Sequence, residues 1–140
     1  MTEKFKILGN YIKDLSSETP DLETYLYARD YISKYQLNID VTSVPLKNKM
    51  IEIITTLKFD DKTDSKKKSY FEIMFVTIIQ VIDEIKDKKE LEKIILCDVQ
   101  LKIYPKLEKT FLDLLSNSGY PNVKFDKKID FEALYNQRFN

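Results

Sequence analysis

Residues 69–81 read Ser69-Tyr70-Phe71-Glu72-Ile73-Met74-Phe75-Val76-Thr77-Ile78-Ile79-Gln80-Val81, a stretch typical of a β-strand. Successive side chains of a strand lie on opposite faces, which gives two sets: Phe71, Ile73, Phe75, Thr77 and Ile79 on one face, and Tyr70, Met74, Val76 and Ile78 on the other. One face of an antiparallel sheet is usually solvated. A strand that is apolar on both faces therefore indicates an extra cover, such as a second subunit. The alternative is a strand enclosed within a single domain.

Two more strands precede this one. Residues 51–59 alternate Ile51, Ile53, Thr55, Leu57 and Phe59 with polar residues, and residues 35–43 alternate Tyr35, Leu37, Ile39 and Val41 with Gln36, Asn38, Asp40 and Thr42. The break at 44–49 predicts that the two strands pair in antiparallel fashion. Residues 60–68 are only charged or small and polar, so we expect a mobile surface loop there.

The first strand occupies the N-terminal end of the chain. Its alternation places Phe5, Ile7, Gly9, Tyr11 and Leu15 on one face and Lys6, Asn10, Asp14, Ser16 and Glu18 on the other. Asp14 and Glu18, four residues and about 13 Å apart on this face, then form an acidic strip. The strip is either a solvated face or a docking surface for a basic partner.

Helical patterns follow the four strands. Leu91, Ile94, Ile95 and Val99 recur at helical spacing from about Asp87, and Leu107, Phe111, Leu114 and Leu115 continue beyond Pro105 to a stop at Ser118-Gly119. Asp130 is a candidate N-cap for a last short helix with Phe131, Leu134, Tyr135 and Phe139 on one face. A helix that short is marginal alone and has to dock. The predicted fold is α+β: a four-stranded antiparallel sheet packed with a long, Pro-interrupted helix and a short C-terminal helix, in one domain over residues 1–140.

Residues 21–34, between the first two strands, are dense in tyrosine. Aromatic side chains offer large contact area at a small entropic cost, which suits adaptable binding. The alternative is a short amphipathic segment in which Leu22, Tyr25 and Leu26 cover the core.

Composition limits the function classes. Lys plus Arg and Asp plus Glu each number 23, so no net field attracts nucleic acid or an anionic membrane. The longest uncharged apolar run, residues 73–81, is well short of the roughly 20 residues of a membrane helix, and Met1-Thr2-Glu3-Lys4 opens no apolar signal region. We expect a cytoplasmic protein without direct membrane insertion.

The residue types needed for common chemistry are scarce. Histidine is absent, Cys97 is the single cysteine and glycine occurs only at Gly9 and Gly119. A histidine base or ligand, a disulfide and a glycine-rich phosphate loop are thereby excluded. Cys97 lies among apolar residues, which indicates a buried, inert thiol. We expect no metal, no cofactor and no enzymatic activity.

Three sets of residues together resemble the SecB family of protein-export chaperones. The first is the run Tyr11-Ile12-Lys13-Asp14-Leu15-Ser16 with Glu18 and Pro20. The second is Tyr104-Pro105, similar to a Phe-Pro inside the family's long helix. The third extends from Leu115-Ser116 through Gly119-Tyr120-Pro121 to Asp130-Phe131-Glu132-Ala133-Leu134-Tyr135. The sets occur in the family's order and cover most of the chain.

Some positions depart from the family pattern. Met74-Phe75-Val76-Thr77 stand where Gln-Gln-x-Gly is typical, Ser17 replaces a Phe, and Tyr31 replaces a Trp. The chain is also formally neutral, whereas family members are often acidic. These differences bear on tetramer packing and on electrostatic docking of a partner.

The resemblance implies an ATP-independent chaperone that holds unfolded precursor proteins and delivers them to the SecA motor. It implies a homotetramer, a dimer of dimers with the long helices between sheets. Position by position, Asp14 and Glu18 are similar to the SecA-docking acids, with Tyr70 and Glu72 as a companion site. Tyr31, Leu134 and Tyr135 lie where the family lines its client groove.

Two other functions remain open from the sequence. The altered fourth-strand motif is compatible with a SecB-like chaperone dedicated to one partner, such as an antitoxin. A small α+β enzyme could instead use Asp14 and Glu18 as acid and base, but such pairs need environments that separate their pKa values, and an exposed strand face offers none.

Overall fold

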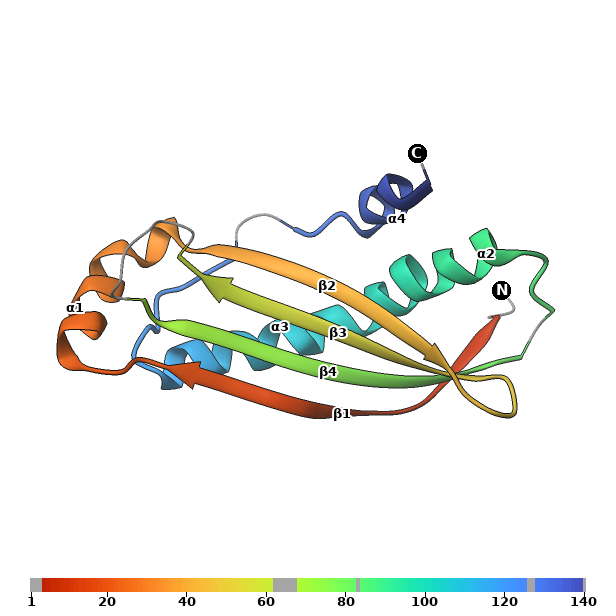
Figure 1. Cartoon of the computed structure of the whole chain (residues 1–140), viewed down its shortest axis with the longest axis horizontal. Helices are drawn as coiled ribbons and strands as arrows, with labels where there is room; N and C mark the ends of the chain where they lie inside the picture. The colour runs from red at the N-terminus through yellow and green to blue at the C-terminus, as the bar shows by residue number, and fades with distance from the viewer. Residues whose placement is uncertain (1–3, 62–67, 83, 126–127, 140) are drawn as a thin grey trace.

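The computed structural model describes residues 4–61, 68–82, 84–125 and 128–139. Its strands are β1 (Phe5–Glu18), β2 (Gln36–Pro45), β3 (Met50–Asp60) and β4 (Tyr70–Val81). They form one antiparallel sheet in the order β1-β4-β3-β2, so β1 and β2 are the edges (Figure 1). The predicted four-stranded antiparallel sheet is confirmed.

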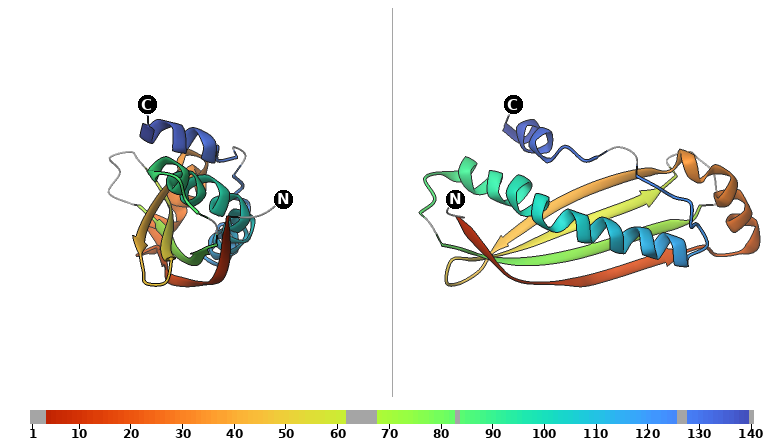
Figure 2. Two further views of the ribbon diagram at one scale, coloured as in Figure 1. Left: turned by 90° about the vertical axis from the view of Figure 1, so that its right-hand side faces the viewer. Right: turned by 180° about the vertical axis from the view of Figure 1, so that it is seen from behind.

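The helices are α1 (Leu22–Tyr31), followed by a 3₁₀ turn (Ile32–Lys34), then α2 (Lys88–Lys93), a π turn (Ile94–Asp98), α3 (Val99–Asn117) and α4 (Phe131–Phe139). Figure 2 shows α2 and α3 running along one face of the sheet. Alternate residues of β3 and β4 face this layer and are buried, among them Ile53, Leu57, Phe71, Ile73 and Ile79. From α3, Leu107, Phe111 and Leu115 meet them, as the helical spacing predicts.

The predicted alternation of β1 is wrong in its middle section, because two bulges interrupt the pairing with β4. The register shifts between Ile7 and Gly9 and again between Ile12 and Asp14. Each bulge adds one unpaired residue and moves the following side chains to the opposite face. Tyr11 therefore pairs with Val76 on the open face of the sheet, and Leu15 pairs with Ile73 on the helix face. Both are about half exposed rather than buried.

The long helix is irregular before Pro105. Regular α-helix resumes at Val99, after the π turn, and α3 runs on through Pro105 to Asn117. The side-chain Nε2 of Gln100 donates to the carbonyl of Ile95 (3.2 Å), and its Oε1 accepts from Thr55 Oγ1 (3.1 Å). All three residues are buried. The Gln100 side chain thus supplies a hydrogen-bond donor to a backbone carbonyl inside the π turn.

The predicted helix stop lies at Gly119, with a φ of 107°. The Tyr120 amide donates to the Leu115 carbonyl (2.9 Å) and the Gly119 amide to Ser116 (3.2 Å), a helix ending that needs a left-handed residue. A Cβ on Gly119 would lie 2.7 Å from Tyr25 Cε1. The turn thereby places Tyr120 against α1, with the Tyr25 and Tyr120 ring centroids 5.6 Å apart.

The short helix α4 docks on the start of the long helix. Asp130 is its N-cap, because Oδ1 accepts from the Ala133 amide (3.0 Å). The Phe131 ring meets Tyr104 edge-on at 5.4 Å, and the Tyr135 hydroxyl donates to the Lys89 carbonyl (3.2 Å).

Cys97, in the π turn, is buried as predicted, and burial raises the pKa of its thiol.

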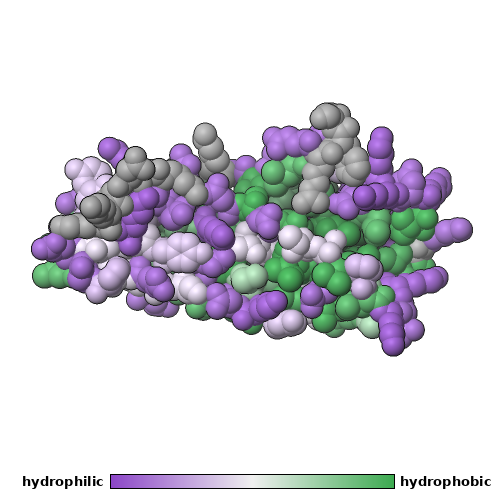
Figure 3. Space-filling model, viewed as in Figure 1, coloured by the Kyte–Doolittle hydropathy of each residue, from purple (hydrophilic) through white to green (hydrophobic). Residues whose placement is uncertain are grey.

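No helix of the described residues covers the other face of the sheet (Figure 2). Val76 is fully buried there between neighbouring strands, whereas Met74 and Ile78 remain partly exposed. Figure 3 shows apolar side chains gathered over the half of the molecule that carries the β2–β3 hairpin, and mainly polar ones over α1. Within the range 60–68, which we expected to be a surface loop, Asp61 is instead buried and accepts from the Tyr27 hydroxyl at the limit of hydrogen-bond distance (3.5 Å). Residues 62–67 lie outside the described residues.

Candidate functional site

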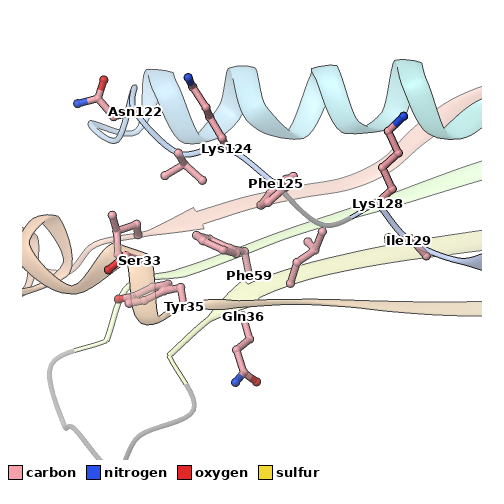
Figure 4. A pocket seen from close by; sticks show the side chains of 12 residues that line it. Ser33, Tyr35, Gln36, Phe59, Asn122, Lys124, Phe125, Lys128 and Ile129 are labelled. Carbon is pink, nitrogen blue, oxygen red and sulfur yellow. The ribbon is translucent and has the colours of Figure 1, made fainter.

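A cavity of about 800 Å³ opens beside the edge strand β2. We call it the β2 pocket. One wall comes from the 3₁₀ turn and the first residues of β2, another from the end of β3, and a third from the segment between α3 and α4 (Figure 4). The apolar part of the lining is Ile32, Tyr35, Leu37, Phe59, Val123, Phe125 and Ile129.

Aromatic rings build the floor of the pocket. Phe59 meets Tyr35 at 5.4 Å and Phe125 edge-on at 5.5 Å between ring centroids. Phe125 also stacks on Phe111 of α3 at 6.2 Å. Residues 118–125 form no helix or strand, so Phe125 is held by these ring contacts rather than by a backbone ladder.

A buried polar cluster fixes the end of the pocket nearest α1. The Tyr35 hydroxyl accepts from the Ser69 amide (3.2 Å), while Ser69 Oγ lies 3.0 Å from both the Tyr120 hydroxyl and Thr19 Oγ1. Burial raises the pKa of Tyr35, which keeps its phenol neutral. Three other segments, which carry Thr19, Tyr35 and Tyr120, thus converge on Ser69, and the Tyr35 ring is fixed where it lines the pocket.

The residues expected to dock SecA share the open face of the sheet. Glu18 lies directly opposite Tyr70 in the β1–β4 register, Ser16 opposite Glu72, and Asp14 opposite Met74. Asp14 accepts a hydrogen bond from Ser16 Oγ (2.7 Å), and Glu72 accepts one from the Tyr70 hydroxyl (2.6 Å).

Burial and the bond to Glu72 raise the pKa of Tyr70. One cation also lies on this face, since Lys58 Nζ is 3.8 Å from Glu72 Oε1. We call Asp14, Glu18, Tyr70 and Glu72 the docking patch.

The residues expected to line a client groove are not brought together. Tyr31 ends α1, where it packs on Tyr27 with ring centroids 4.6 Å apart and carries Lys34 over its face. Leu134 and Tyr135 belong to α4, toward the other end of the molecule (Figure 1). None of the three lines the β2 pocket, which lies between them along the segment that joins α3 to α4.

The sequence did not single out Phe59 and Phe125 as site residues. One local signal was present: Val123 and Phe125 are apolar residues in a stretch without strand or helix periodicity, and such residues need a distant surface to cover them.

The described part of the chain contains no candidate metal site. No group of three or more His, Cys, Asp or Glu side chains could hold a metal ion among those residues. The described helices also include none long and apolar enough to cross a membrane. The arrangement suits binding of an apolar, extended ligand.

Comparisons with known proteins place the chain in a family. The whole chain, residues 1–140, matches the family model described as "SecB: Preprotein translocase subunit SecB". It is 59% identical over 140 residues to a putative protein-export protein SecB of Pelagibacter ubique, covering 100% of both chains. It is 26% identical over 137 residues to the protein-export protein SecB of Parvibaculum lavamentivorans, covering 96% of this chain and 79% of that one.

A solved structure has the same fold. It is a SecB-like chaperone of Mycobacterium tuberculosis in complex with an antitoxin peptide, with a TM-score of 0.63 and 10% identity over 89% of this chain and 91% of that one.

Proposed function

The chain belongs to the SecB family and is a protein-export chaperone, and we propose that it holds unfolded precursor proteins in the β2 pocket until they are exported. The single observation that carries this proposal is the aromatic-floored cavity of about 800 Å³ beside an edge strand. Residues 1–140 act as one chaperone domain in this proposal.

The pocket suits an unfolded chain in two ways. Apolar side chains of a client gain roughly 25 cal/mol for each Å² that they bury against Tyr35, Phe59 and Phe125. Edge strand β2 can pair with the backbone of an extended client, a mode of recognition that does not depend on client sequence. Binding is promiscuous for that reason and needs no ATP.

The client groove extends in both directions from the pocket. A smaller cavity, lined by Arg29, Ile32, Gly119 and Tyr120 among others, adjoins the pocket on the α1 side, where Tyr31 lies. The segment after Phe125 leads on to α4, which carries Leu134 and Tyr135. We assign these three residues to the two ends of one extended groove, with the β2 pocket at its centre.

The working unit is a homotetramer, a dimer of dimers. Exposed apolar residues support the proposal: Leu8, Tyr11, Ile12 and Leu15 on β1, and Leu101 on α3. Edge strands with exposed apolar side chains are covered by pairing in stable proteins. Several grooves on one particle would raise the affinity for a long client by about two to four orders of magnitude while each contact stays weak.

Delivery to SecA uses the docking patch. Its support is the shared open face of Asp14, Glu18, Tyr70 and Glu72, which one rigid sheet presents together. The protein would act in the cytoplasm, as a carrier and not as an enzyme.

A holding assay tests the proposal. An unfolded precursor is diluted into buffer with or without the protein, and its refolding is followed by fluorescence. We expect a concentration-dependent delay without ATP. Refolding at the unassisted rate would contradict the proposal. Light scattering after size-exclusion chromatography tests the assembly separately, with about four times the 16.6 kDa chain mass expected.

A further inference from the structure

The open face of the sheet changes character from one end to the other. The docking patch occupies the end nearest α1, and Met74 pairs with Asp14 at its border. Beyond Met74, this face carries Val76 and Ile78 on β4 and Ile54 on β3. Figure 3 shows apolar side chains gathered over this half of the molecule, toward the β2–β3 hairpin. Carboxylates and an apolar surface thus adjoin on one rigid sheet.

The apolar part of this face is accessible. Val76 is fully buried, but Ile54, Met74 and Ile78 each remain partly exposed. We call these three residues the apolar strip. Tyr11, which pairs with Val76, flanks the strip and is 48% exposed. A partner surface laid on the sheet would therefore bury apolar side chains here.

Assembly through the edges would not cover the strip. Its residues belong to β3 and β4, the two central strands of the sheet. Pairing between the edge strands of two copies extends a sheet sideways and leaves its faces as they were. The helix α3 lies on the opposite face of the sheet (Figure 2). The strip is thus free for a partner other than a second copy.

The energetics of docking favour such a partner. Each solvent-exposed ion pair contributes little and is screened by salt, so the carboxylates of the docking patch alone would bind weakly. Stable interfaces combine a polar rim with an apolar centre. Ile78 lies six residues beyond Glu72 on the same face of β4, about 20 Å away. One helix of about 13 residues spans that distance.

We propose that the apolar strip is the second half of the docking surface. Its occupant is a partner segment that carries basic side chains at one end and, within about 20 Å, apolar side chains on the same face. This inference rests on the proposed delivery to SecA. The carboxylates guide the approach of the partner, and the strip supplies the part of the affinity that salt does not screen.

Calorimetric titration with SecA at low and high salt tests the inference. The double variant Met74→Gln/Ile78→Thr keeps the length of one side chain and the β-branch of the other, which suits exposed strand positions. We expect its Kd to rise about tenfold at both salt concentrations, because the lost contacts are apolar. The heat-capacity change of binding should become less negative. Asp14→Arg/Glu18→Arg should instead lose affinity mainly at low salt.

Two further variants control for the fold. Met74→Gln alone should raise the Kd about threefold, and it carries the test if urea denaturation shows the double variant to be unfolded. Leu22→Gln is the matched control, since it removes an apolar side chain that is 70% exposed on α1. It should bind SecA as the original protein does.

Each other outcome overturns a defined claim. An unchanged Kd in the strip variants, while Asp14→Arg/Glu18→Arg weakens binding, overturns the strip and leaves the docking patch standing. A smaller particle mass in the strip variants would show that a second copy covers the strip. Loss of precursor holding would show that a client covers it, and either result overturns the assignment. No binding of SecA to the original protein overturns the proposed delivery and this inference together.

Discussion

Phe125 meets Phe59 edge-on, with their ring centroids 5.5 Å apart. The contact joins the end of a central strand to a segment 66 residues later in the chain, and it divides the core of the protein from the β2 pocket. Phe59 is almost fully buried, whereas Phe125 remains partly exposed toward the cavity. A client that enters the pocket therefore meets the Phe125 ring.

Removing this ring should weaken client binding and, separately, lower the stability of the fold. For Phe125→Ala we expect about a tenfold rise in the Kd for an apolar peptide, roughly 1.4 kcal/mol. The loss of its two ring contacts, with Phe59 and Phe111, should cost stability about 0.5–1.5 kcal/mol for each pair. Anisotropy and urea denaturation measure the two effects. Phe125→Leu, which keeps an apolar side chain, should retain most of the affinity, and equal losses in both variants would contradict the assignment.

Gly119→Ala should destabilise the protein by about 1–3 kcal/mol, because its φ of 107° is a left-handed conformation that suits glycine. The added Cβ would also collide with Tyr25. Gly9→Ala is the matched control, since nothing lies within 4 Å of a Cβ at Gly9. It should change stability by less than about 1 kcal/mol. Urea denaturation midpoints compare the two, and similar midpoints would contradict the expected strain.

Gln100→Met keeps the volume of the side chain but removes the amide. The Ile95 carbonyl and the Thr55 hydroxyl then lose their buried partner, at a cost of about 2 kcal/mol. Adding Thr55→Val removes one of the two unpaired groups, so the double variant should regain part of the lost stability. Additive losses in a double-mutant cycle would show that the two side chains are not coupled.

Asp14→Arg with Glu18→Arg should weaken SecA binding in a salt-sensitive way and leave precursor holding intact. Asp40→Arg is a suitable control, because Asp40 pairs with Thr56, Thr56 with Met74 and Met74 with Asp14 across the same face. The Asp40→Arg variant reverses one charge on the same face of the sheet, but on edge strand β2 instead of edge strand β1. Calorimetric titration with SecA measures the effect, and an unchanged affinity in the Asp14 and Glu18 variant would remove these residues from the docking patch.

The regular elements could be predicted from the sequence because their signals are local. Period-two alternation identified β2, β3 and β4, and helical spacing with Gly119 and Asp130 identified the long helix and the start of α4. The family resemblance and the export-chaperone function are also confirmed. The roles of Asp14, Glu18, Tyr31, Tyr70, Glu72, Leu134 and Tyr135 stay predictions.

Features that depend on distant contacts could not be predicted in this way. The π turn is coupled to a hydrogen bond between Gln100 and Thr55, which are 45 residues apart. The β2 pocket depends on Phe59, Phe125 and Tyr35 meeting from three elements. Contacts between residues so far apart in the sequence leave no periodic pattern within a local window. The bulges of β1 were missed because apolar residues occupy both of its faces.

The two bulges of β1 decide which face of the sheet each later side chain of the strand occupies. Lys13 is the extra residue at the second bulge, and beyond it Asp14, Ser16 and Glu18 all fall on the open face of the sheet. Deleting Lys13 would remove the bulge and keep these pairings, whereas deleting Leu15 would turn Ser16 and Glu18 toward the helix layer and leave the composition of the strand almost the same. Insertions and deletions, more than substitutions, therefore decide whether a relative of this protein can present its acids to the outside.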